Sequence, residues 1–176
     1  MSSTALIRFS GLAAILAGLL RGIASVLPST IPIIDLEILY FFTDVFILFG
    51  LMGLYAFQHE EIGVGGFIGF LIATVGIGSI IGPDGEISGL SMYVVGASIF
   101  AVGLNLFAIG TWKASKLPRW VPALWILSTI IGFIGYFAKG YSMLFVISGI
   151  IFSVSYGGAG VQMWSAVDNT RRSQNA

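Results

Sequence analysis

The chain has 176 residues, of which 57% are hydrophobic and only 9% are charged, and its eight basic residues balance eight acidic ones. A soluble domain usually carries about a quarter charged residues. These numbers exclude an ordinary cytosolic enzyme, a disordered chain and a nucleic-acid-binding protein with a basic face. The mean hydropathy of +0.99 indicates instead a protein surrounded by lipid, so the lipid bilayer is the first partner we expect.

Six stretches of the sequence are long and apolar enough to cross a bilayer, which takes about 20 mostly apolar residues. We predict spans over residues 7–27, 38–57, 62–82, 92–112, 120–138 and 143–164. No proline interrupts the middle of a span, and Gly82-Pro83-Asp84-Gly85 between two spans is typical of a turn. The predicted fold class is all-α: a polytopic integral membrane protein whose residues 1–176 form one compact six-helix transmembrane bundle.

Basic residues divide unequally between the two sides of this map. One side, which holds both chain ends, carries six: Arg8, Lys113, Lys116, Arg119, Arg171 and Arg172. The other side carries only Arg21 and Lys139. Because loops rich in lysine and arginine stay in the cytoplasm, we expect both termini there. Tryptophans at the first side and tyrosines at the second fit the same map, since both rings favour the headgroup level.

Small residues recur at helical spacing within the spans. Because helices in lipid associate through close backbone approach, we expect packing seams at Gly18, Gly22, Gly65, Gly69, Gly76 and Gly157. Packing within one chain is the favoured interpretation, and contact with a second copy or with other membrane proteins is the alternative.

Glycines also fit a division of the chain into two three-helix repeats. Gly11 and Gly18 in the first span correspond to Gly96 and Gly103 in the fourth, and Gly76 in the third corresponds to Gly157 in the sixth. Repeats with an odd number of spans are inverted relative to each other, which is an arrangement used by transporters. Rigid packing of glycines explains the same residues without a repeat.

Two charges fall inside the predicted spans at matching depth. Arg21 lies six residues before the end of the first span and Asp44 lies six residues after the start of the second, so both sit roughly 9 Å below the surface. We expect an Arg21–Asp44 salt bridge that offsets the cost of placing charges in lipid. Arg21 could instead extend outward to the headgroups, or the pair could simply lock the first hairpin.

Glu37 and Asn105 complete the candidate polar site. Glu37 precedes Asp44 by seven residues and shares its helix face, so it is a second candidate partner for Arg21. Asn105, within the fourth span, is the other polar residue expected to be buried, with an interhelical hydrogen bond as its structural role.

Catalytic chemistry has little support in the residue inventory. The absence of cysteine excludes disulfides, thiol catalysis and iron–sulfur clusters, and one histidine, His59, cannot provide both ligands of a haem. We therefore expect no cofactor and no metal. His59-Glu60-Glu61 fits a solvated loop better than an acid–base site, so a membrane enzyme using His59 is the least favoured interpretation.

In size, short loops and glycine-rich spans, the chain resembles the small six-span inner-membrane proteins of prokaryotes, which implies a prokaryotic inner or plasma membrane. No specific motif carries that resemblance, so it assigns no residue a role. From the residues, the favoured function is a non-enzymatic accessory or structural membrane component, without a water-filled cavity at Arg21 and Asp44. The alternative is a small-solute or ion transporter or channel in which Arg21, Asp44 and Asn105 face a pathway.

Overall fold

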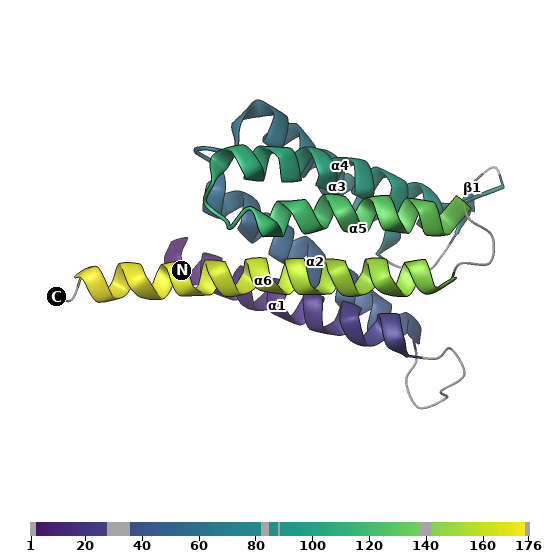
Figure 1. The fold of residues 1–176 in the computed structure, drawn as a ribbon, viewed down its shortest axis with the longest axis horizontal. Helices are drawn as coiled ribbons and strands as arrows, with labels where there is room; N and C mark the ends of the chain where they lie inside the picture. Colours follow the sequence, from purple (N-terminus) through teal and green to yellow (C-terminus); the bar gives the residue numbers. More distant parts are fainter. Residues whose placement is uncertain (1–2, 28–35, 82–84, 88, 138–141, 175–176) are drawn as a thin grey trace.

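A computed structural model describes residues 3–27, 36–81, 85–87, 89–137 and 142–174, with side chains described over 4–27, 36–81, 85–86, 89–137 and 143–167. Helices account for nearly all of these residues (Figure 1). Their bounds are α1 (Ser3–Val26), α2 (Leu36–Gln58), α3 (Gly63–Ile80), α4 (Met92–Ala114), α5 (Trp120–Phe137) and α6 (Ser142–Gln174). The six helices are each long and apolar enough to cross a membrane, so the chain is a multi-pass membrane protein.

Helices follow from the solvent, because lipid offers no partner to backbone N–H and C=O groups and a helix satisfies them internally. The observed ends lie close to the predicted spans except in α6, which continues ten residues beyond residue 164. That extension is polar, and no proline or glycine between Ser165 and Gln174 stops the helix. The surface is apolar where lipid would cover it: the exposed fraction is 76% for Val64 and 71% for Phe137.

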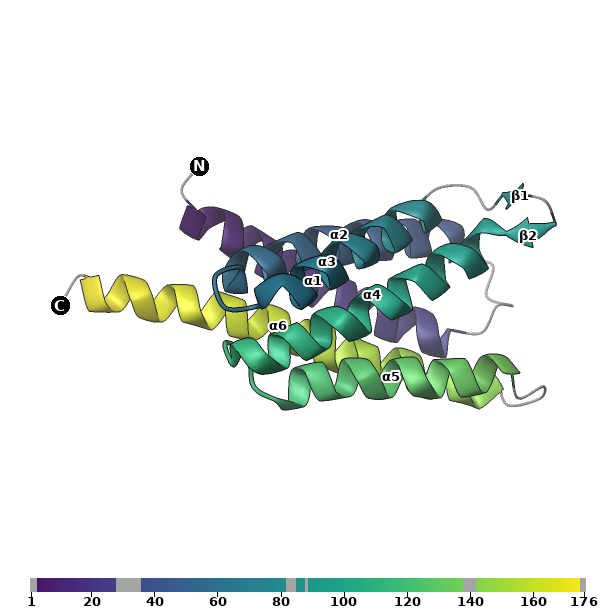
Figure 2. The same cartoon turned by 90° about the horizontal axis from the view of Figure 1, so that it is seen from above.

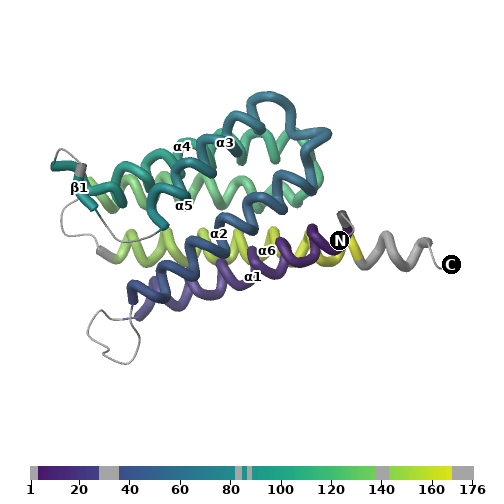
Figure 3. Tube along the Cα trace, turned by 180° about the vertical axis from the view of Figure 1, so that it is seen from behind, coloured from purple at the N-terminus to yellow at the C-terminus, as the bar shows by residue number. Residues whose placement is uncertain are grey.

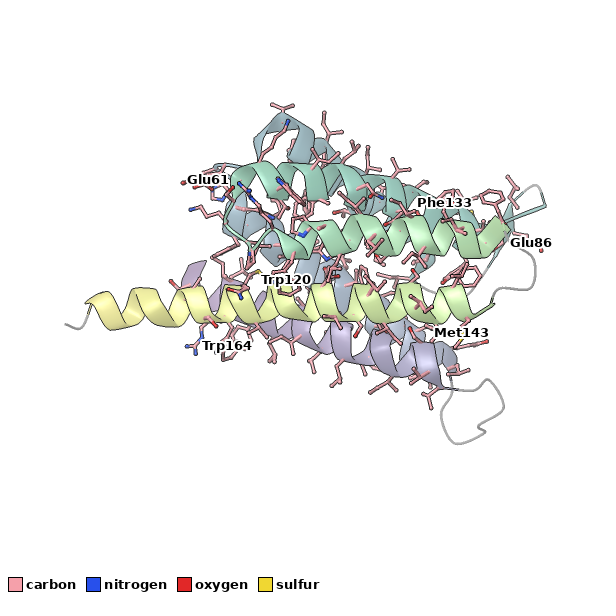
Figure 4. The ribbon with its side chains drawn as sticks, viewed as in Figure 1. Glu61, Glu86, Trp120, Phe133, Met143 and Trp164 are labelled. Atoms are coloured by element: carbon pink, nitrogen blue, oxygen red, sulfur yellow. The ribbon has the colours of Figure 1, made fainter. Side chains whose placement is uncertain are left out.

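Both chain termini lie at the same end of the bundle (Figures 1 and 2). We call this end the terminal face; it holds the 59–62 and 115–119 connections. The opposite face holds Val26, Leu36, Ile80, Met92 and Phe137. Figure 4 places Glu61 and Trp164 toward the terminal face and Glu86 and Met143 toward the opposite face. Lys139 lies outside the described residues, as do the side chains of Arg171 and Arg172, so the predicted cytoplasmic location of the termini stays a prediction.

The helices form a closed ring in chain order, because each one packs on the next and α6 returns to α1. The closest pairs are α3–α4 and α1–α6, whereas the α2–α3 and α4–α5 junctions are the loosest. Seen from behind, α2 runs between the α1–α6 pair and the α3–α4 pair (Figure 3), and it also touches α6. The interior of the ring therefore lies between two tightly packed helix pairs.

Glycines make the α3–α4 pair close. A Cβ at Gly69 would overlap the backbone nitrogen of Phe107, and one at Gly76 would overlap the backbone nitrogen of Phe100. Gly65 differs from the expectation, because nothing lies within 4 Å of a Cβ there. The reason is helical geometry: Gly66, one residue further along, is on the face that meets α4, and Gly65 points away from it.

The α1–α6 pair is equally close. A Cβ at Gly18 would lie 2.6 Å from the Ser153 carbonyl oxygen, and one at Gly22 would lie 2.7 Å from Ser153 Oγ. A Cβ at Gly157 would meet only ordinary contacts, the nearest being the Cα of Gly18 at 3.9 Å. Gly18, rather than Gly157, is therefore the residue that needs to be glycine at this crossing.

A short hairpin precedes α4. Strand β1 (Glu86–Ile87) pairs with β2 (Leu90–Ser91) in antiparallel register, with Glu86 opposite Ser91. Gly89, in the turn, has a φ of +79°, a value that favours glycine. The sequence predicts a turn at residues 82–85, of which 82–84 lie outside the described residues; the two-residue strands were not predicted because their pattern is too short to read.

Candidate functional site

A cavity of about 320 Å³ lies inside the ring, in the half of the bundle next to the opposite face. All six helices contribute to its wall. On α4 the lining runs from Tyr93 to Leu104, which is about 16 Å at the helical rise per residue. The cavity therefore extends from the opposite face to about the middle of the bundle.

Arg21 of α1 and Asp44 of α2 both line this cavity. Among the described residues they are the only lining residues with a formal charge, one cation and one anion. Each side chain is half-buried, and the charge of Arg21 acts on the Asp44 carboxyl. The two side chains that the sequence places at one depth thus meet at one site.

The expected direct Arg21–Asp44 salt bridge is absent among the described residues. The close packing of α1 on α6 explains the difference. Arg21 is drawn toward α6, where its Nε lies 3.8 Å from the position of a Cβ at Gly149. Both charges therefore keep hydrogen-bonding capacity that the other does not use.

Four serine and threonine side chains also line the cavity, and each of their hydroxyl groups donates its hydrogen to a backbone carbonyl. Ser98 donates to Val94 over 2.8 Å and Thr129 donates to Trp125 over 2.9 Å within their own helices. Ser128 also donates to Trp125, and Ser148 of α6 donates to the carbonyl of Ser128 on α5 over 2.8 Å. With their hydrogens engaged, these hydroxyl groups can bind a further group only as hydrogen-bond acceptors.

Aromatic rings make up much of the remaining wall, and they come from α4, α5 and α6: Tyr93, Phe100, Phe133, Tyr136, Phe137, Phe145 and Phe152. Pockets for small organic molecules combine such an apolar wall with a few placed polar groups, and they begin at about 300 Å³. The cavity meets both conditions at the low end of the size range.

Three fully buried rings lie about one helical turn beyond the last lining residues of α4, α5 and α6, toward the terminal face: Phe107, Trp125 and Tyr156, which we call the aromatic floor. Trp125 lies with its ring centroid 6.0 Å from that of Phe107 and 6.2 Å from that of Tyr156. The Tyr156 hydroxyl donates to the carbonyl oxygen of Ile47 on α2 over 2.5 Å. The floor thereby joins α4, α5, α6 and α2 at the level where the cavity ends.

The bundle between the floor and the terminal face contains a buried polar pair. Gln58 Nε2 donates to Thr111 Oγ1 over 3.0 Å, and both side chains are fully buried. Gln58 Oε1 and the indole N–H of Trp125 have no hydrogen-bond partner among the described residues. A buried polar group without a partner costs roughly 1–3 kcal/mol of stability. The presence of two such groups at this level of the bundle therefore needs a functional or structural explanation.

Glu37 and Asn105 are not among the cavity-lining residues. Glu37 is exposed near the start of α2, and Asn105 is half-buried and donates to the Ala101 carbonyl of its own helix over 2.7 Å. The structure thus brings together two of the four candidate site residues. The lining hydroxyls were missed, although adjacent Ser128 and Thr129 within an apolar span were a signal for them.

The His59 loop is a solvated surface feature. His59 Nδ1 lies 2.9 Å from the Ala56 carbonyl oxygen, and Glu61 pairs with Lys116 of the 115–119 connection over 2.8 Å. The Glu61 carboxylate raises the pKa of Lys116 by accepting its hydrogen bond and by its charge. Exposed pairs of this kind add little stability, and no group that could hold a metal ion occurs among the described side chains.

Comparison with known proteins gives no guide to the role of this site: no protein-family model, no curated protein and no solved structure matches the chain.

Proposed function

We propose that the chain is a membrane transporter that receives a small solute in the cavity from the opposite face and releases it toward the terminal face. The observation that carries this proposal is the cavity itself, with Arg21 and Asp44 on its wall inside the membrane-spanning parts of α1 and α2. Charged side chains within a membrane are costly and commonly mark a solute or ion pathway. An accessory protein held together by dry packing has no need of such a cavity.

The aromatic floor supplies the element that separates the two faces. In the described arrangement Phe107, Trp125 and Tyr156 have no exposed surface, and the cavity lining stops about one helical turn before them. A transporter needs a second arrangement in which this barrier opens. The unpartnered Trp125 N–H and Gln58 Oε1 are the groups that would gain partners when water or solute passes the floor.

The ring also contains junctions at which such a movement can occur. The glycine-packed pairs α3–α4 and α1–α6 are close, whereas α2–α3 and α4–α5 are loosely joined. Movement of α3–α4 against the rest of the bundle would leave both tight seams intact. Gly18 of α1 faces α6 and its counterpart Gly103 of α4 faces α3, which is the pairing that two inverted three-helix repeats would produce.

The glycine contacts weigh against the accessory alternative. Gly18, Gly22, Gly69 and Gly76 are all used within the chain, so they are not available as a face for a partner. Catalysis is not included in the proposal, because His59 is remote from the cavity: it lies in the loop at the terminal face.

A cysteine-accessibility experiment tests transport, and the cysteine-free chain provides a clean background. Leu54 is fully buried on α2, on the terminal side of Ile47 and one turn from Gln58. If the floor opens toward the terminal face, Leu54→Cys reacts with a membrane-impermeant thiol reagent added at that face of sealed vesicles.

Met163→Cys is the matched control, because Met163 is also fully buried but packs against Gly11 in the α1–α6 seam. We expect Leu54→Cys to be modified and Met163→Cys to stay unmodified. Equal modification of both would show general loosening of the bundle, and modification of neither would show a floor that stays closed; either result contradicts the proposal.

A further inference from the structure

The geometry points to a zwitterion as the solute: a small molecule that carries one cationic amine, one anionic group and an aromatic or other apolar part. This inference rests on the proposed function, because it names the chemical class that the same cavity would take. It begins from the charges that the described residues place on the wall, which are one cation, Arg21, and one anion, Asp44.

Separation of the two charges is the first step of the argument. If Arg21 and Asp44 formed a direct salt bridge, they would satisfy each other and offer little to a ligand. No such bridge is present among the described residues, although the two charges act on each other. A ligand with an anion at Arg21 and an amine at Asp44 would form two charge-assisted hydrogen bonds, which are about twice as strong as neutral ones.

Net charge is the second step. A purely cationic solute would meet Asp44 but would bring its charge close to Arg21, and a purely anionic solute would meet the reverse problem. Each would bring an uncompensated charge into the membrane-spanning part of the bundle beside a group of like charge, which is unfavourable. A zwitterion adds no net charge, so it is the class that matches both groups at once.

The hydroxyls favour the amine side of the same ligand. Ser98, Ser128, Thr129 and Ser148 donate their hydrogens to backbone carbonyls and present only acceptor oxygens. An ammonium group has three hydrogens to donate and no acceptor. It can use these oxygens together with Asp44, whereas the guanidinium of Arg21 is the charged donor for the anion.

The aromatic wall sets the third part of the ligand. Phe100, Phe133 and Phe152 line the cavity from α4, α5 and α6, and pairs of aromatic rings gain stabilisation beyond the burial of apolar area. A solute with an aromatic or branched apolar group would therefore bind better than a purely polar zwitterion of the same charge.

A matched series of probes tests the inference on the purified 176-residue chain in an uncharged detergent. The probes are phenylalanine, phenethylamine, which lacks the carboxylate, and 3-phenylpropionate, which lacks the amine. Binding is measured by calorimetry and by the rise in unfolding temperature that a ligand of the folded state produces. We expect phenylalanine to bind at least about tenfold more tightly than either single-charge analogue.

Charge-neutral variants make the test specific to the two residues. Asp44→Asn should reverse the order so that 3-phenylpropionate binds better than phenylalanine, and Arg21→Gln should favour phenethylamine. Ser98→Ala, which removes an acceptor but no charge, should keep the preference for the zwitterion. If a variant does not fold, the comparison of the three probes on the native chain still decides the inference.

Two sources offer this chemistry, a free amino-acid-like solute and a zwitterionic lipid headgroup, and a second arm separates them. Short-chain phosphatidylethanolamine is added in place of phenylalanine, with short-chain phosphatidylglycerol as the anionic control. Displacement of bound phenylalanine by the zwitterionic lipid alone identifies a headgroup as a ligand; no displacement identifies a free solute.

The inference is overturned if a single-charge probe binds as tightly as phenylalanine, or if none of the three binds. Its failure is distinct from failure of the proposed function. Opening of the floor at Leu54 together with a preference for a single-charge probe would keep transport and reject the zwitterion. A preference for the zwitterion with a permanently closed floor would keep the ligand and reject transport.

Discussion

Tyr156 on α6 donates its hydroxyl hydrogen to the carbonyl oxygen of Ile47 on α2, and this bond holds the aromatic floor against the far side of the ring. Both residues are buried. The bond crosses the ring interior, where α2 and α6 touch only weakly. This hydrogen bond therefore joins α6 to α2 at the level of the aromatic floor.

Removing that link should loosen the floor without removing the ring. We expect Tyr156→Phe to lower the free energy of unfolding by about 1 kcal/mol, as is usual for one hydrogen bond, and to speed modification of Leu54→Cys from the terminal face. Thermal unfolding in detergent measures the first effect and thiol labelling measures the second. A variant as stable as the native chain, with unchanged labelling, would show that the bond does not hold the floor.

The Gln58–Thr111 pair should show the asymmetry expected of a buried hydrogen bond. Thr111→Val leaves the Gln58 amide buried without this partner and should cost roughly 1–3 kcal/mol. The double variant Gln58→Leu with Thr111→Val removes both polar groups and should be closer to the native stability than Thr111→Val alone. Chemical unfolding of the four proteins in one detergent measures this cycle; additive losses would contradict it.

The α3–α4 seam predicts opposite results for two neighbouring glycines. Gly69→Ala places a Cβ against the backbone of α4 and should cost about 2 kcal/mol or more, because the helices must separate. Gly65→Ala points into open space and should change stability by less than about 1 kcal/mol. The unfolding temperatures of the two variants test this prediction. Similar losses of stability in both would mean that Gly65 also packs against a neighbouring helix.

The α1–α6 seam offers a second matched pair. Gly18→Ala would place its Cβ 2.6 Å from a backbone oxygen of α6, whereas Gly157→Ala would have its nearest contact at 3.9 Å. We expect only Gly18→Ala to reduce the yield of folded protein in membranes and its unfolding temperature. Equal tolerance of both substitutions would contradict the observed register of these two helices.

The sequence was sufficient for the six helices, because a bilayer imposes their length and their internal hydrogen bonding. It also placed Arg21 and Asp44 together, since consecutive antiparallel helices bring equal depths side by side. It could not show that Arg21 packs toward Gly149 of α6, because the closure of the ring by α1 and α6 joins residues far apart in the chain. The same long-range closure creates the cavity, which no local pattern of residues predicts.

Glycine patterns had a similar limit. Spacing alone placed Gly65 and Gly69 in one seam, because residues four apart lie on the same side of a helix. Both contact a partner helix only if the crossing angle keeps the partner close to both positions. The register of α4 against α3 selects Gly66 and Gly69. That register depends on the fit of Phe100 and Phe107 against α3, which is a property of two helices and not of one sequence segment.

The central claim is that a water-accessible solute cavity lies inside the bundle at Arg21 and Asp44, and neighbouring cysteines on α5 test it most directly. Thr129 lines the cavity, whereas Ile130 at the same depth has 51% of its side chain exposed on the outer, lipid-facing surface. A membrane-impermeant thiol reagent reacts with thiolates, which require water. Added at the opposite face of sealed vesicles, it should modify Thr129→Cys and leave Ile130→Cys unmodified. If Thr129→Cys is as unreactive as Ile130→Cys, the cavity is dry and closed, and the account is contradicted.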